Sequence, residues 1–334
     1  MLRKKTLLAS AFGLALVPLA AAAQDETKVT INQAFQSLLY LPLYVAQEQG
    51  FFTAQGLKVS IQTGGGGAQS WAAVIGGSAQ FSIQDPVFVP KSREMGGDGV
   101  VVAGVQNAPT VFIFGKDDTP LQNNLAHLSG KRIITSPEPD TTWAFMSYLI
   151  EQEGLTDVSI VNVSIGNEIP AIMADRADYA LAVDPQVAQA EIDNGLHATY
   201  SFSGEQSWYP YAFSSLTTTQ AYIDENPEAA QGIVTAFEQA SRFIYADFDR
   251  TVEIAMQYFP QLSEEVVRAS VQREIDAKGY PETVAVSEKA WENNMKISVY
   301  AGTLEEYPSE ATSYAANVNT ELATKAAASL DAAN

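Results

Sequence analysis

The sequence predicts an α/β fold made of two lobes, and two features of the chain support this prediction. Short β-branched runs alternate with helical stretches, which is the order expected of largely parallel sheets flanked by helices. Residues 110–120 and 208–220 interrupt the alternation, because each is predicted as a strand without a helix packed immediately before it. A complete βαβαβ block lies between them. The chain is therefore expected to leave one lobe, build a second and return.

The strand-to-helix turns are the expected ligand site. The first strand is predicted at residues 28–35, followed by a loop and a helix that starts just after Pro42 and ends at Gly50. The later strands LKVSIQ, AQFSIQ, KRIIT and DYALAV each lead into a helix through a turn that carries Gly, Pro, Asp or Thr. From Ala221 onwards the sequence is mostly helical. Because open α/β sheets bind ligands beyond the carboxyl ends of their strands, these turns are where a ligand is expected.

The first 23 residues have the pattern of a secretory signal peptide. Three cations at residues 3–5 precede an apolar run, and Ala21 to Ala23 supply the small residues of a cleavage site. No later stretch is predicted as a transmembrane helix. We therefore expect an exported, periplasmic protein whose mature chain begins near Gln24.

Charge and composition exclude several classes of function. The 334 residues carry a formal net charge of −20, and nucleic-acid binding needs a basic surface. The chain has no cysteine, so disulfides and thiolate zinc sites are excluded. No spacing of His, Cys or Asp suggests a metal site.

Five segments resemble one family of exported proteins. They are LPLYVAQEQGFFTAQGLKVSI, the glycine loop and helix at residues 64–75, SAQFSIQDP, GKRIITSPEPDTTWAFMSYLIEQEGL and RADYALAVDPQVAQAEIDNG. In this order and spacing they are similar to the periplasmic solute-binding proteins of ABC importers. The resemblance is to the NMT/THI-like group, which includes binders of nitrate, alkanesulfonates, taurine and thiamine-precursor pyrimidines. It extends from about Lys28 to Ala240.

The resemblance implies the type II periplasmic-binding-protein fold, in which each lobe is a mostly parallel sheet flanked by helices and two crossing strands form a hinge. We expect a signal peptide at residues 1–23, a first lobe formed by residues 24–115 and 213–334, and a second lobe formed by residues 116–212. The family implies capture of a small-molecule solute and its delivery to a membrane permease that works with a cytoplasmic ATPase. We expect a monomer with no cofactor.

Aromatic and carboxylate side chains at the predicted strand ends are the main ligand candidates. Tyr40, Trp71 and Tyr209 could stack on a planar solute, although an aromatic on a helix, such as Trp71, packs into the core as often. Asp85 and Asp184 could accept hydrogen bonds from an amino group, or could cap the helices that begin at the prolines after them.

Further candidates come from backbone geometry. Glycines at residues 64–67 allow a ligand to approach the main chain closely, or form a flexible turn. Thr141 and Thr142 begin a helix whose free N–H groups could hold an anionic head group. The complete predicted set is Tyr40, Leu41, Gly65, Gln69, Trp71, Gln84, Asp85, Thr141, Thr142, Trp143, Asp184 and Tyr209.

The charge of these loops favours a neutral or cationic solute. Asp85, Glu138, Asp140 and Asp184 bring negative charge to them, and they contain no Arg or Lys. We therefore favour an amine-bearing heterocycle, such as a thiamine-precursor pyrimidine, over an alkanesulfonate, taurine or nitrate. The sequence departs from the family at Val183, where an aromatic residue often precedes the acidic one, which weakens any transfer of a relative's specificity.

An enzyme related to thiamine-pyrimidine synthases is the alternative of another class. Such a reaction would need a pyridoxal-binding lysine, histidine and reactive cysteines in the pocket. The chain has two histidines, His127 and His197, in segments predicted to lie at the surface, and no cysteine. We therefore expect a binding protein and not an enzyme.

Overall fold

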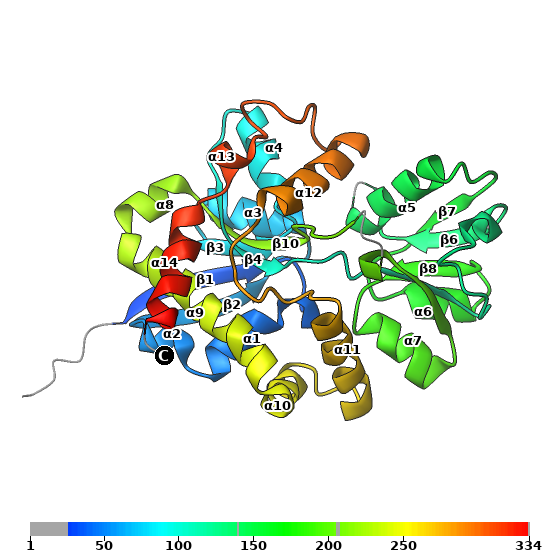
Figure 1. Cartoon of the computed structure of the whole chain (residues 1–334), viewed down its shortest axis with the longest axis horizontal. Coiled ribbons are helices and arrows are strands. Elements are labelled where there is room, and N and C mark those ends of the chain that lie inside the picture. Colours follow the sequence, from blue (N-terminus) through cyan, green and yellow to red (C-terminus); the bar gives the residue numbers. More distant parts are fainter. Residues whose placement is uncertain (1–25, 139, 205–207, 333–334) are drawn as a thin grey trace, which may run out of the picture.

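The computed structural model describes residues 26–138, 140–204 and 208–332, and these form two lobes (Figure 1). Each lobe is built on a five-stranded sheet flanked by helices, which confirms the predicted fold class. The first sheet has the order β2-β1-β3-β10-β4 and comprises β1 (Thr27–Gln33), β2 (Leu57–Thr63), β3 (Phe81–Gln84), β4 (Val100–Gln106) and β10 (Ser214–Thr218). The second has the order β7-β6-β8-β5-β9 and comprises β5 (Phe112–Gly115), β6 (Arg132–Thr135), β7 (Ser159–Asn162), β8 (Tyr179–Ala182) and β9 (His197–Ser201).

Helices cover both sheets. Those of the first lobe are η1 (Leu38–Tyr40), α1 (Leu41–Glu48), α2 (Phe51–Ala54), α3 (Gly67–Ile75), α4 (Phe88–Glu94), α8 (Gln220–Glu225), α9 (Pro227–Ala246), α10 (Phe248–Tyr258), α11 (Glu264–Asp276), α12 (Glu288–Tyr300), α13 (Tyr314–Asn317) and α14 (Thr320–Asp331). Those of the second are η2 (Leu125–Leu128), α5 (Thr141–Gln152), α6 (Glu168–Met173), α7 (Gln186–Asn194) and η3 (Phe202–Gly204). No helix among the described residues is long and apolar enough to cross a membrane.

The two sheets share one topology. In the first, β10 lies antiparallel between β3 and β4, and the remaining neighbours pair in parallel. In the second, β5 lies antiparallel between β8 and β9 in the same way. Each inserted strand is the first one that the chain forms after crossing from the other lobe (Figure 1). The sheet of each lobe therefore includes a strand, β10 or β5, that directly follows a crossing between the lobes.

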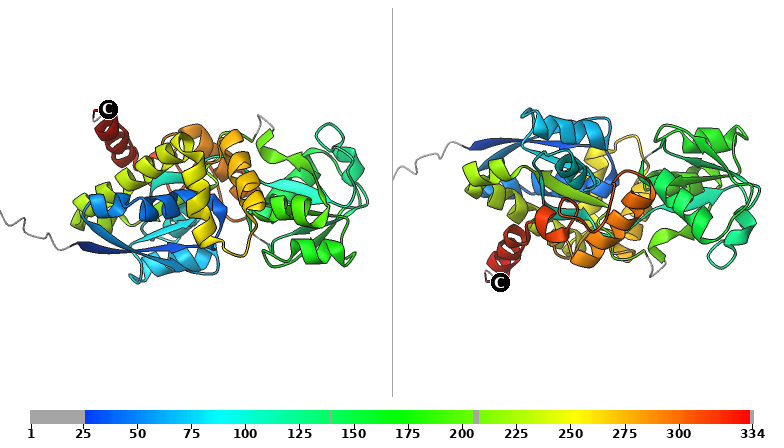
Figure 2. Two further views of the ribbon diagram at one scale, coloured as in Figure 1. Left: turned by 90° about the horizontal axis from the view of Figure 1, so that it is seen from below. Right: turned by 90° about the horizontal axis from the view of Figure 1, so that it is seen from above.

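The predicted lobe boundary at residue 115 is wrong by this one strand. β5 hydrogen-bonds to β8 and β9, so residues 112–115 belong to the second sheet and not to the first. The chain crosses between Gln106 and Phe112 and returns between η3 and β10. Two views from other directions show the same separation of the green second lobe from the rest of the chain (Figure 2). The predicted signal peptide lies outside the described residues.

The segment around Pro42 forms as its sequence requires. Ser37 accepts a hydrogen bond from the Leu39 N–H group at 3.2 Å and so begins η1, and Pro42 occupies the first turn of α1, where a missing N–H group costs nothing. Tyr40 and Leu41 are fully buried at this junction. They therefore fix the loop after β1 to the core.

Trp71 lies in the core of the first lobe. Its indole is 6% exposed and packs with Val74 and Val89, and it leaves room for no side chain at Gly99. The sequence left open whether Trp71 stacks on a solute or packs in the core, and in the structure it packs in the core.

Replacement of Gly99 by Ala should therefore destabilise the first lobe. The added Cβ would lie 2.7 Å from the Trp71 ring, an overpacking that costs about 1–3 kcal/mol. Urea unfolding measures the change. Gly104→Ala, on the adjoining strand, is the control, because its added Cβ meets no atom closer than 3.6 Å. Equal stability of the two variants would show that the Trp71 ring is not fixed against Gly99.

Candidate functional site

The loops that follow β3 and β6 meet between the lobes. The Thr141 hydroxyl, in the first turn of α5, donates a hydrogen bond to Oδ2 of Asp85 at 3.1 Å. Asp85 follows β3 directly, so this bond joins the carboxyl end of a strand of the first sheet to a helix of the second lobe. The structure thus brings two of the predicted ligand residues together from opposite lobes.

Asp85 is held in a fixed position by the first lobe. Its Oδ1 accepts hydrogen bonds from the Val87 N–H group and from Nδ2 of Asn294 on α12, both at 3.0 Å. Burial raises the pKa of this carboxyl from 3.8 to about 6, and the bonds from Val87, Asn294 and Thr141 limit the rise. The carboxyl is therefore mostly ionised at neutral pH and is still able to accept.

The charge of this carboxylate acts on two buried tyrosines. Burial raises the pKa of the Tyr40 phenol, an effect that a hydrogen bond with Ser214 partly offsets and the charge of Asp85 increases. Burial and the charge of Asp85 likewise raise the pKa of the Tyr211 phenol well above its usual range. Both phenols are therefore neutral. We call Asp85, Thr141, Asn294, Tyr40, Tyr211 and Ser214 the Asp85 cluster.

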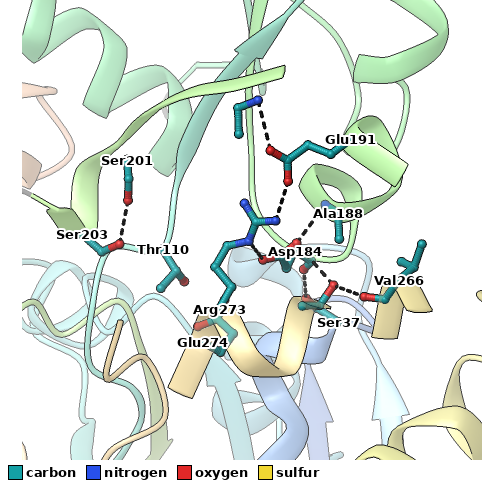
Figure 3. Close-up of polar contacts among 12 residues, drawn as sticks. Ser37, Thr110, Asp184, Ala188, Glu191, Ser201, Ser203, Val266, Arg273 and Glu274 are labelled. Carbon is teal, nitrogen blue, oxygen red and sulfur yellow. Dashed lines mark hydrogen bonds and ion pairs between the residues drawn. The ribbon is translucent and has the colours of Figure 1, made fainter. Parts of the chain in front are cut away.

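Asp184 forms a second meeting point of the lobes (Figure 3). Its carboxylate is completely buried, and Oδ1 accepts hydrogen bonds from the Ala188 N–H group at 3.0 Å and from the Ser270 hydroxyl at 3.3 Å. Its backbone oxygen accepts a hydrogen bond from the Ser37 hydroxyl at 3.4 Å. The Ala188 bond lies in the first turn of α7, so Asp184 does stabilise the helix start, as its position before a proline suggests.

Arg273 on α11 supplies the cation that the loop sequences lack. Its Nε lies 3.1 Å from Oδ2 of Asp184, and its Nη2 donates to Oε2 of Glu191 at 2.7 Å. The conclusion that no Arg or Lys acts at these strand ends is therefore incomplete. The residue lies on a helix beyond the segments that carry the family resemblance, and no local pattern connects it to Asp184.

A buried carboxyl group adjoins Arg273 at the first crossing. Glu274 is completely buried and accepts a hydrogen bond from Nε2 of Gln106, the last residue of β4, which also donates to the Thr110 hydroxyl at 2.8 Å. Burial raises the pKa of Glu274 to about 8, the charge of Asp184 adds to the rise, and the bonds with Gln106 and Thr110 limit it. Glu274 is therefore protonated in much of the folded protein at neutral pH.

The other predicted residues lie in three kinds of place. Leu41 and Gln84 are buried, and Gln84 donates to the Thr217 hydroxyl at 2.9 Å while its own Oε1 has no hydrogen-bond partner. Gly65 and Gln69 are exposed. The half-buried set is Thr142, which accepts a hydrogen bond from the Ser136 N–H group at 2.9 Å, Trp143, which packs on the core, and Tyr209.

A groove of about 760 Å³ also lies between the lobes, and Tyr211 of the Asp85 cluster lines it. Its walls come from η2 and α5 of the second lobe and from α12 of the first, and include Tyr148, Trp208, Lys289 and Lys296. None of the residues predicted to bind ligand lines it. We place the candidate site at the Asp85 cluster, because the carboxyl ends of strands converge there and a partly buried charge is held there.

Comparison with known families agrees with this architecture. The model of the family described as NMT1/THI5 like matches residues 39–250. The chain belongs to the NMT1/THI5-like family. It is 23% identical over 316 residues to the Bacillus subtilis (strain 168) protein named "Putative binding protein YtlA", and the match covers 92% of each chain.

Solved structures with the same fold include transport and enzyme proteins. The ligand-binding component of an ABC-type import system from Staphylococcus aureus aligns with a TM-score of 0.72 and 14% identity, over 90% of this chain and 99% of that one. The alkanesulfonate-binding protein SsuA from Xanthomonas axonopodis pv. citri aligns at 0.67 and 16%, over 88% and 98%. The desulfurization enzyme DSZB aligns at 0.67 and 14%, over 91% and 99%. At these identities the likeness shows the fold alone.

Replacement of Glu274 by Gln should change how stability depends on pH. Between the ordinary carboxyl pKa of 4.5 and the folded value of about 8, the folded protein holds a proton that the unfolded chain has released. The contribution of Glu274 to stability is therefore complete below about pH 4.5 and is lost as the pH rises through 8.

The measurement is urea unfolding of the wild type and of Glu274→Gln from pH 5 to pH 8. As the pH rises between the unfolded and folded pKa values of Glu274, the free energy of unfolding of the variant should increase relative to that of the wild type. The increase should be about 1.4 kcal/mol for each pH unit. Glu265→Gln, at an exposed position of the same helix, is the control. A pH-independent difference for Glu274→Gln would contradict the raised pKa.

Proposed function

We propose that this protein is the extracytoplasmic solute-binding component of an ABC importer. A solute that contacts both lobes would favour their closed arrangement through its differential affinity, and closure would present it to a membrane permease served by a cytoplasmic ATPase. The observation that carries the proposal is the Thr141–Asp85 contact, which shows that residues at the strand ends of opposite lobes reach each other. Membership of the NMT1/THI5-like family supports the same role.

The solute that fits the Asp85 cluster best is an amine-bearing heterocycle. Asp85 is an ionised acceptor whose charge acts on two neutral, buried tyrosines, so it can receive an amino or ring N–H group of a solute. The buried carbonyl oxygen of Gln84, the residue before Asp85, also has no hydrogen-bond partner among the described residues. An unpaired acceptor beside Asp85 favours a solute that donates.

An alkanesulfonate, taurine or nitrate is the alternative solute class. The fold shared with an alkanesulfonate-binding protein favours it, and Arg273 brings a cation to the lobe junction. That guanidinium already contacts two carboxylates, Asp184 and Glu191. An anionic solute would therefore have to compete with them, which is why we favour the amine.

A thiamine-pyrimidine synthase-like enzyme remains the alternative of another class, since one protein of this fold is named an enzyme. His127 bonds to Asp117 of the second lobe through Nε2 at 2.9 Å, and His197 is exposed at the start of β9. Neither belongs to the Asp85 cluster. A binding role therefore fits the site better than a reaction that needs histidine there.

A thermal-shift screen tests the solute class. It should include aminopyrimidines, flavins, aromatic acids, taurine, alkanesulfonates and nitrate, because a ligand that binds only the native form raises the melting temperature. We expect an aminopyrimidine to give the largest rise. A larger rise with taurine or a sulfonate would contradict the amine preference, and no rise with any compound would count against solute binding in these classes.

Replacement of Asp85 by Asn tests the role of the carboxylate. For an amine-bearing solute, loss of the charge-assisted bond should weaken binding by about 1.5–3 kcal/mol, measured by titration calorimetry. The control is Asp193→Asn, which removes an exposed carboxylate of α7. Unchanged affinity in Asp85→Asn would exclude Asp85 as the solute's partner.

A further inference from the structure

Arg273 connects the two lobes more extensively than a single ion pair would. It belongs to α11 of the first lobe, and its side chain contacts the carboxylates of Asp184 and Glu191 in the second lobe (Figure 3). It also contacts a third group of that lobe, the ring of Phe112. The guanidinium carbon lies 4.9 Å from the centroid of that ring. Charge pairing and cation–π attraction therefore both hold the Arg273 side chain to the second lobe.

The helix that carries Arg273 is firmly attached to the first lobe. Ser263 begins α11 by accepting a hydrogen bond from the Val266 N–H group, and Val266, Val267 and Val271 are completely buried. The next residue, Glu274, is bonded to Gln106 at the end of β4. The helix also packs along α7 of the second lobe, so a movement of that lobe away from α11 would separate Arg273 from its partners.

Two serines reinforce the same contact. Ser270, which precedes Arg273 by one helical turn, donates to Oδ1 of Asp184, and Ser37 donates to the backbone oxygen of Asp184. The Asp184 side chain is completely buried, whereas the Arg273 side chain is 22% exposed and that of Glu191 is 36% exposed. The pair with Asp184 is therefore shielded from screening by salt, and the pair with Glu191 is screened more.

We infer that Arg273 is an interlobe latch, which stabilises the closed arrangement of the lobes through protein contacts alone, before any solute contributes. The latch comprises Arg273, Asp184, Glu191, Phe112, Ser270 and Ser37. Its partners lie outside the Asp85 cluster, so it regulates access to that site without forming part of it.

The consequence for transport rests on the proposed function. If solute enters only when the lobes are apart, its association rate is proportional to the open fraction, which the latch reduces. The latch itself does not depend on the identity of the solute and can be tested without one.

Arg268 provides a matched control on the same helix. It pairs with Glu264 and Asp249 and lies 5.6 Å from the ring of Phe248, so it has two carboxylates and one aromatic ring just as Arg273 has. All of its partners belong to the first lobe. Replacement of either arginine by Gln removes a cation from two carboxylates and a ring, although the partners of Arg268 are more exposed, and only the replacement of Arg273 affects the contact between lobes.

The experiment measures the distance between the lobes in the full-length mature protein without added solute. The chain has no cysteine, so Glu265→Cys on α11 and Asp193→Cys on α7, both exposed, accept spin labels at these two positions only. Pulsed electron resonance then gives the distance distribution. In Arg273→Gln the ratio of short to long distances should fall by about tenfold, which corresponds to 1.4 kcal/mol, and in Arg268→Gln it should not change.

A second variant, Glu191→Gln, keeps the test valid if Arg273→Gln does not fold. It removes the more exposed partner from the second lobe, so it should preserve the fold and shift the distribution in the same direction by a smaller factor. The double variant should shift it by less than the product of the two single effects. An unchanged distribution in Arg273→Gln, or an equal change in Arg268→Gln, would overturn the latch. Neither result would bear on solute binding at the Asp85 cluster, which the thermal-shift screen tests separately.

Discussion

The pairing of the two chain crossings is the constraint on which this structure depends. The outgoing and returning segments bond to each other, through Tyr211 N–H to the Asn107 oxygen and Phe213 N–H to the Gln106 oxygen, both at 3.0 Å. Each crossing then ends in a strand that is held on both sides within a sheet, β5 in one lobe and β10 in the other. Relative motion of the lobes is therefore confined to short segments between two rigid sheets, as hinge closure requires.

This hinge brings two clusters of different chemistry to the junction. The Asp85 cluster has an ionised carboxylate near buried phenols, and the Thr141 hydroxyl bonds to it from the other lobe. The latch around Arg273 satisfies most of its charge within the protein. The physical difference is the cation: Asp184 has one and Asp85 has none among the described residues. It explains why a donor from a solute is expected at Asp85, although both carboxylates follow a strand of a parallel pair and precede a proline.

The sequence was sufficient for the arrangement of elements and for part of the candidate site. Alternating patterns, turn residues and the two interruptions located the strands, the lobes and Asp85, because these features depend on local periodicity and backbone chemistry. It could not place β5 in the second sheet, since strand pairing depends on long-range contacts that a four-residue strand does not encode. Nor could it orient Trp71 toward Gly99 or bring Arg273 to Asp184, because both contacts join segments that only the tertiary fold makes neighbours.

Small-angle scattering with the solute that the screen identifies tests the central claim most directly. It should be recorded for the wild type and for Arg273→Gln. Without solute, the latch already holds more of the wild type in the closed arrangement, so its radius of gyration should change less on binding. The account predicts that the radius of gyration of the variant falls on addition of solute and that both proteins reach the same final value. A radius that stays unchanged in both proteins, at a concentration that saturates binding, would contradict capture between the lobes.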